Sequence, residues 1–101
     1  MGLKVLVIDD EPGFLQMIQV ILSRAGYQVT PVTDATEALQ LLDKSRFDLC
    51  LCDLNMPGLD GMAFLGEVKN RGLPMTVIMM TAYGSADTAI AALKAGAYDY
   101  I

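Results

Sequence analysis

The sequence predicts one α/β domain built on a doubly wound parallel sheet, and three observations support this fold class. The chain has 101 residues, which is enough for one hydrophobic core and too few for two. Nearly continuous apolar runs alternate along it with amphipathic helical patterns, and the connections are short. Helices between consecutive strands make those strands parallel, and helices on both faces explain strands that are apolar on both sides.

Five apolar segments are predicted to form the strands. The second segment contains Pro31, which cannot donate a ladder hydrogen bond, so this strand belongs near an edge of the sheet. The predicted strands are residues 3–9, 27–32, 47–52, 75–81 and 97–101.

Four helices are predicted between these strands. Asp34 and Glu37 have the spacing of a capping box at the start of the second helix. Gly26 and Gly72 follow helical patterns at positions typical of a helix end, and Ser85 is a cap for the last helix. The predicted helices are residues 14–26, 34–45, 62–72 and 85–96. The apolar face of the first helix is predicted to be Phe14, Met17, Ile18, Ile21, Leu22 and Ala25.

Composition excludes several classes of protein. The net charge of -5 and the pI of about 4.3 argue against direct contact with nucleic acid, which needs clustered Lys and Arg. No apolar run has the length of a membrane span, and the N-terminus leads into a strand that acids stop after Ile8, unlike a signal peptide. Cys50 and Cys52 share one strand face, where a bridge between them would be strained, and there are too few ligands for zinc. We expect both cysteines to be reduced and buried, in a cytoplasmic protein.

Acidic residues follow two of the predicted strands. Asp9 and Asp10 end the first strand, Asp53 ends the third, and the hydroxyl residue Thr81 ends the fourth. Because a parallel sheet brings these strand ends to one rim, the carboxylates should form a cluster. Like charges this close repel and raise at least one pKa, unless a hard divalent cation with oxygen ligands binds between them. The rim is therefore predicted to be a functional acidic site.

Four stretches together resemble the receiver domain of bacterial two-component response regulators. They are "VLVIDDEP" (5–12), "DLCLCDLNMPGLDG" (48–61), "VIMMTAYG" (77–84) and "LKAGAYDY" (93–100). The resemblance covers the whole chain, residues 1–101, and the last third is most similar to receivers of NtrC-type transcription activators. It implies a flavodoxin-like five-stranded sheet with strand order 2-1-3-4-5.

The resemblance also implies roles for the acidic residues. Asp53 matches the phosphoacceptor, whose carboxylate attacks the phosphorus of a phosphohistidine on a sensor kinase. Asp10 matches a direct Mg²⁺ ligand, Asp9 a ligand that acts through water, and Asn55 a donor of its backbone carbonyl. Phosphoryl transfer needs its equatorial oxygens neutralised, which Mg²⁺ does while keeping several waters.

Other matched residues imply a conformational switch. Thr81 matches the hydroxyl that moves to the phosphoryl group, Ala82 leaves room for that group, and Tyr100 matches the aromatic residue that turns inward. The side chains of Asn55 and Tyr83 should tune the access of hydrolytic water. The module is expected to signal rather than act as an enzyme, through an output face on helix 85–96 and strand 97–101 that also allows a dimer. Its expected partners are a cognate sensor histidine kinase and an output domain or target protein.

One departure from the family pattern stands out. A Lys-Pro pair and a fifth helix normally follow the last strand, whereas this sequence stops at Ile101. We expect a truncation within or just after that strand, which agrees with the high apolar content of 53% and the mean hydropathy of +0.42. Without the helix, Val and Leu side chains on one side of the sheet near the first and last strands should be exposed and drive self-association.

Three alternatives remain. A pseudo-receiver that only docks partners is the main one, because the lysine is missing. A phosphohydrolase of the haloacid dehalogenase type would place its nucleophile at the first strand with a second acid two positions later, whereas here the acids are adjacent. A flavodoxin-like cofactor binder would need a phosphate loop where this chain has "DDEP" (9–12).

Overall fold

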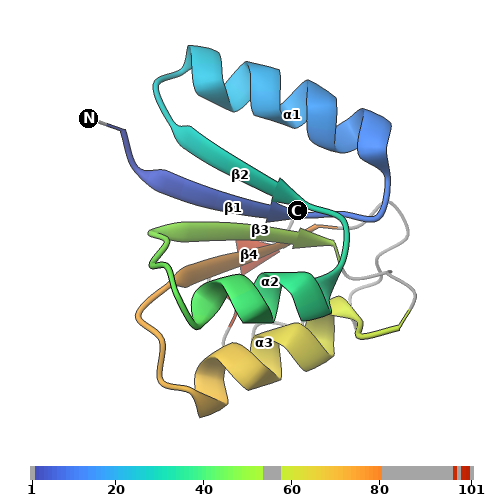
Figure 1. Cartoon of the computed structure of the whole chain (residues 1–101), viewed down its shortest axis with the longest axis vertical. Coiled ribbons are helices and arrows are strands. Elements are labelled where there is room, and N and C mark those ends of the chain that lie inside the picture. Colours follow the sequence, from blue (N-terminus) through green and yellow to red (C-terminus); the bar gives the residue numbers. More distant parts are fainter. Residues whose placement is uncertain (1, 54–57, 81–96, 98, 101) are drawn as a thin grey trace.

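The computed structural model of the chain describes residues 2–53, 58–80, 97 and 99–100. They contain a parallel sheet of five strands in the order β2-β1-β3-β4-β5, which confirms the predicted fold class and strand order (Figure 1). The edge position of β2 agrees with its proline, Pro31, which lies opposite Val7 of β1. The strands are β1 (Lys4–Ile8), β2 (Gln28–Val32), β3 (Leu49–Asp53), β4 (Thr76–Met80) and β5 (Asp99–Tyr100).

The helices form a layer on each side of the sheet. Helix α1 (Pro12–Arg24) covers one face, and α2 (Ala35–Leu42) and α3 (Gly61–Asn70) cover the other (Figure 1). The helix predicted at 85–96 lies outside the described residues. None of the helices in the described part of the chain is long and apolar enough to cross a membrane.

The helix starts follow from local capping chemistry. Helix α1 begins with Pro12, two residues before the predicted start, because the fixed φ of proline suits the first helical position and no amide hydrogen bond is lost there. Asp34 caps α2 as predicted, since its Oδ1 accepts a hydrogen bond of 2.9 Å from the Glu37 amide. Asp60 has an equivalent role at the start of α3 that was not predicted, since its Oδ1 accepts a hydrogen bond of 2.9 Å from the Ala63 amide.

The residues that α1 buries against the sheet differ from its predicted apolar face. Leu15 is buried against the sheet, and Ile18 and Leu22 pack beside it. Met17 and Ile21, which the periodicity placed on the same face, are instead about half exposed. The apolar stripe of this helix is wider than the surface that the sheet offers, so one half of the stripe faces away from the core.

Two apolar clusters lie on the two faces of the sheet. The larger one joins α2 and α3 to inward side chains of the strands, and Phe64 of α3 and Leu6 and Ile8 of β1 are fully buried in it. Cys50 and Cys52 belong to this cluster as free thiols, which confirms the prediction of reduced, buried cysteines. Burial raises the pKa of both thiols well above the ordinary value, so they stay protonated.

The second cluster contradicts the prediction that Val side chains near the first strand are exposed. Val5 and Val7 of β1 are buried under α1, although we expected Val side chains to be exposed on this side. Leu49 and Leu51 of β3 are partly buried at the margin of α1. Among the described residues, the apolar side chains exposed on this side of the sheet therefore belong mainly to α1 and not to the strands.

Candidate metal and phosphorylation site

Three carboxylates converge at the carboxyl ends of β1 and β3. Asp9 and Asp10 follow β1, and Asp53 is the last residue of β3. The two strands are neighbours, with Ile8 paired to Cys52, and this register brings the next residues together. One oxygen of each of the three carboxylates lies within 4.8 Å of the others. The predicted acidic cluster is thus present, with Asp10 exposed and Asp9 and Asp53 partly buried.

Backbone hydrogen bonds hold Asp9 in place. Its amide donates to the carbonyl oxygen of Val32 on β2 at 3.1 Å, which extends the β1–β2 pairing by one residue. Its Oδ1 accepts a hydrogen bond of 2.9 Å from the Glu11 amide, a turn that aspartate favours. The chain is thereby turned from β1 towards α1, and the Asp9 carboxylate is positioned before any ligand arrives.

The electrostatics of the cluster disfavour ionised Asp9. Burial raises its pKa above the ordinary value of 3.8, and the charges of Asp53, Asp10 and Glu11 raise the pKa further. The hydrogen bond from the Glu11 amide opposes this rise. A bound cation would remove the conflict, because it stabilises the ionised carboxylates.

The raised pKa predicts that the substitution Asp9→Asn stabilises the protein at neutral pH without divalent cations. An acid with a raised pKa in the folded state binds more protons there than in the unfolded state, so stability falls as pH rises from 3.8 through the folded pKa. Asparagine removes this cost and keeps an oxygen that accepts from the Glu11 amide. Thermal melts should therefore show a higher Tm for Asp9→Asn at pH 7, and the difference should vanish below pH 3.8.

Magnesium provides the control for this prediction. Adding the ion should raise the Tm of the wild type more than that of Asp9→Asn, since only the wild type regains attraction at that carboxylate. A wild type that is at least as stable as Asp9→Asn in chelator at pH 7 would contradict the electrostatic explanation.

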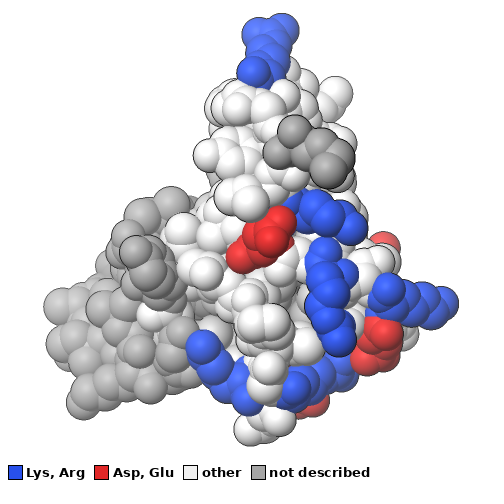
Figure 2. All heavy atoms as spheres, turned by 90° about the vertical axis from the view of Figure 1, so that its left-hand side faces the viewer, with Lys and Arg blue, Asp and Glu red and all other residues white. Residues whose placement is uncertain are grey.

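The described basic residues lie at the end of the sheet opposite the acidic site. The site lies at the carboxyl end, where the described charged residues are acidic, including the helix caps Asp34 and Asp60. Figure 2 shows the opposite end, where the strands begin and where Lys and Arg gather. The described basic residues start β1, lie in the last turn of a helix or follow a helix, and they are Lys4, Arg24, Lys44, Arg46, Lys69 and Arg71.

The position of the basic residues leaves the acidic cluster without a neighbouring lysine among the described residues. Lys4, Lys44 and Lys69 belong to the end of the sheet where the strands begin, so none of the described lysines can neutralise the three carboxylates. The remaining lysine, Lys94, lies outside the described residues. The donors that the described residues offer at the rim are carboxylate oxygens, which suit a hard cation such as Mg²⁺ or Ca²⁺ better than a metal that prefers nitrogen or sulfur.

Several predicted site residues cannot be placed relative to the cluster. Asn55, Thr81, Ala82 and Tyr83 lie outside the described residues. The backbone of Tyr100 belongs to β5 and pairs with Met79 of β4, as predicted for the last strand, but its side chain is not described.

The loop after Asp53 is closed by two features of its described end. Gly58 has a φ of 77°, a left-handed conformation that residues with a side chain rarely adopt. Asp60 then caps α3, which begins at Gly61, one residue before the predicted start. The signal for this start was an aspartate directly before an apolar helical pattern.

A parallel sheet with an acidic rim at its carboxyl end belongs to the α/β domains, which bind ligands beyond the strand ends. Comparison with known proteins identifies the family within that class. Residues 5–101 match the family model of the response regulator receiver domain. The chain therefore belongs to the receiver domains of response regulators.

Similar proteins agree with this assignment. The chain is 40% identical over 98 residues to response regulator protein PilR of Pseudomonas aeruginosa. The aligned region covers 97% of this chain and 22% of PilR. It is 39% identical over 100 residues to transcriptional regulatory protein ZraR of Escherichia coli K12, covering 99% of the chain and 23% of ZraR. The chain thus spans less than a quarter of the length of these curated relatives.

Solved structures show the same fold. The receiver domain of the Francisella response regulator 1452 superposes with a TM-score of 0.94 at 33% identity, covering 99% of this chain and 83% of that one. NtrX from Brucella abortus superposes with a TM-score of 0.91 at 34% identity, covering 100% of this chain and 24% of that one. These relatives support the similarity to NtrC-type regulators.

Proposed function

We propose that this receiver domain accepts a phosphoryl group on Asp53 from the phosphohistidine of a sensor kinase, with Mg²⁺ bound at the acidic cluster. The observation that carries the proposal is the convergence of Asp9, Asp10 and Asp53 within 4.8 Å at the ends of two central strands. Asp53 is suited to be the acceptor because it lies on the middle strand of the sheet, between the ends of β1 and β4.

The chemistry of the step assigns a role to each carboxylate. A carboxylate oxygen of Asp53 attacks the phosphorus, a new P–O bond forms, and the P–N bond to the kinase histidine breaks with its electron pair returning to the imidazole. Asp10 and Asp9 would hold the cation together with Asp53 and the backbone carbonyl of Asn55. The cation supplies neutralisation of the charge on the phosphoryl oxygens. The turn at Asp9 keeps the Asp9 carboxylate in position before the phosphodonor binds.

The response to phosphorylation is assigned to the part of the chain that follows β4 in the sequence. We place the switch hydroxyl at Thr81 and the switch aromatic at Tyr100, with the output face on residues 85–101. The relatives PilR and ZraR are named as regulators, and this supports a partner kinase and an output domain that controls transcription. The two free, buried cysteines support a cytoplasmic location.

The substitution Asp10→Asn tests the cation site. It removes one charge from the cluster, and two unit charges about 4 Å apart near a protein surface attract by about 4 kcal/mol at an effective dielectric constant of 20. Solvent screening at this exposed residue leaves an expected loss of Mg²⁺ affinity of at least about tenfold. Titration of Mg²⁺ followed by amide chemical shifts should show changes at residues 9–11 and 53–55 in the wild type, at much lower concentration than in Asp10→Asn.

The same pair of proteins tests the function. Acetyl phosphate with Mg²⁺ should add one phosphoryl group to the wild type, whereas chelator or Asp10→Asn should slow the labelling strongly. Unchanged amide shifts at residues 9–11 and 53–55 would exclude the cation site. Equal labelling with and without Mg²⁺ would exclude the proposed mechanism.

A further inference from the structure

The outward side of α1 carries no charge before the last helical residue, Arg24. Between Glu11 and Arg24 the sequence has no Asp, Glu, Lys or Arg. A helix on a protein surface normally presents charged residues to water on the side opposite the core. Here Met17 and Ile21 are each 52% exposed, and Val20 is 47% exposed. This surface is typical of a helix that packs against something on both sides.

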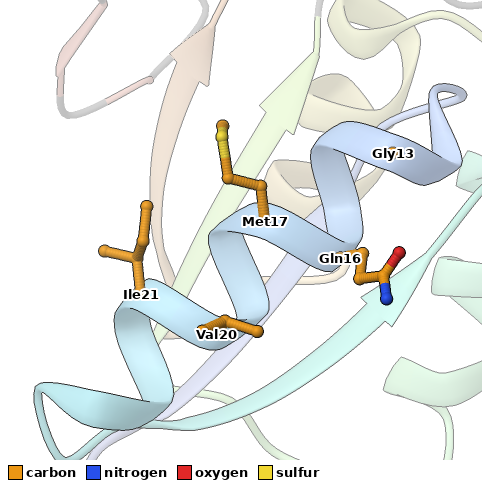
Figure 3. Close-up of a pocket in the computed structure, with 5 residues that line it drawn as sticks. All are labelled: Gly13, Gln16, Met17, Val20 and Ile21. Carbon is orange, nitrogen blue, oxygen red and sulfur yellow. The ribbon is translucent and has the colours of Figure 1, made fainter.

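The exposed residues form a defined strip. Gly13, Met17 and Ile21 are spaced by four residues, so they lie in one row along the helix, and Met17 and Ile21 project side by side (Figure 3). Gln16 and Val20 form the neighbouring row, and the five residues line one shallow hollow. We call these five residues the α1 strip.

The strip has a gap at one end and a projecting side chain at the other. Gly13 has no side chain, and a methyl group added there would meet only an oxygen of the Glu11 carboxylate, at 3.5 Å. Ile21 lies two turns further along and projects into solvent. Met17 is midway between them, four residues from each. The strip can therefore receive a side chain at Gly13 and offer one at Ile21.

The ends of the strip carry opposite charges. Glu11 precedes the helix and its carboxylate lies beside Gly13, whereas Arg24 is the last helical residue. Neither residue belongs to an ion pair within the described part of the chain, where the ion pairs involve Arg71. Both side chains are thus available to a partner, one anionic and one cationic, on either side of an uncharged centre.

We propose that the α1 strip is a contact surface for a second copy of this chain, with the two α1 helices antiparallel and a two-fold axis at Met17. In this arrangement Ile21 of each copy fills the gap over Gly13 of the other copy. Glu11 lies six residues before Met17 and Arg24 seven residues after it. At a rise of about 1.5 Å per residue, Glu11 then comes within about one residue of Arg24 of the second copy, at both ends.

The charges at the two ends of the strip favour an antiparallel contact with a second copy over a parallel one. A surface with an acid at one end, a base at the other and an apolar centre is complementary to itself when reversed. A parallel pair would instead bring like charges together. The contact is small and should be weak, in the class of interfaces below about 1,200 Å². The proposal does not depend on phosphorylation and is tested without Mg²⁺ or phosphodonor.

Analytical ultracentrifugation of the 101-residue chain over a wide concentration range tests the dimer. We expect Glu11→Arg or Arg24→Glu alone to weaken association by roughly tenfold at low salt, because symmetry places each repulsive contact twice. The double variant should regain most of the lost affinity, because it restores an acid opposite a base. Circular dichroism establishes that each variant is folded.

Cross-linking tests the position of the axis. The native thiols are buried, so a cysteine introduced by Met17→Cys should form an intermolecular disulfide across the axis. The matched variant Ser23→Cys, also exposed on α1, should not, since the two copies of residue 23 would lie about 18 Å apart along the helices. A chain that stays monomeric, a charge reversal without rescue, or equal cross-linking of both variants would overturn the proposal. A monomer whose phosphorylation by a kinase is lost in Ile21→Glu would also overturn it and assign the strip to another protein.

Discussion

The substitution Asp53→Asn is expected to abolish phosphorylation of the domain. Asparagine is nearly isosteric but lacks the anionic oxygen that attacks phosphorus, so no acyl phosphate can form at this position. The wild type with acetyl phosphate and Mg²⁺ should gain one phosphoryl group, measured by mass spectrometry of the intact protein. Asp53→Asn should gain none under the same conditions.

Asp48→Asn provides the matched control. Asp48 precedes the same strand at its opposite end and accepts a hydrogen bond of 2.8 Å from the Lys4 amide through Oδ2, which an asparagine oxygen can replace. This variant should be labelled like the wild type. Equal labelling of Asp53→Asn and the wild type would place the acceptor elsewhere, and loss of labelling in both variants would indicate general damage to the fold.

The substitution Phe64→Ala is expected to cause the largest loss of stability. Phe64 lies on α3 and is fully buried in the larger cluster together with Leu6, Ile8 and Met79. Removing a buried phenyl ring costs about 3–5 kcal/mol, through lost transfer free energy and the cavity that remains. A domain of this size has a total stability of about 5–15 kcal/mol, so the variant should be close to unfolding.

Chemical denaturation with urea measures this effect. Phe14→Ala is the matched control, because Phe14 lies on α1 and is only partly buried, and its loss should cost less than about 2 kcal/mol. Equal losses in the two variants would contradict the assignment of Phe64 to the centre of the core. If Phe64→Ala retained its stability, the packing of α3 against the sheet would not be as the structure has it.

The sequence by itself determined the fold class and the acidic rim. Unbroken apolar runs separated by helical patterns leave a parallel sheet as the arrangement that buries both strand faces, and the structure has such a sheet. The strand order β2-β1-β3-β4-β5, which the structure confirms, was implied by the resemblance to receiver domains and not by the pattern. Acids directly after the first and third runs had to meet at one rim, because parallel strands end together, and Asp9, Asp10 and Asp53 do so. These features are local in sequence, so pattern and strand direction suffice to predict them.

Periodicity alone predicted one broad apolar face on α1, but it cannot tell which part of that face the sheet covers. Packing against Val5 and Val7 buries Leu15 and leaves Met17 and Ile21 half exposed. The raised pKa of Asp9 likewise needs the register of β1 with β3 and the burial that the neighbouring strands impose. Tertiary structure decided these points because burial and the distance between charges depend on residues that are far apart in the chain.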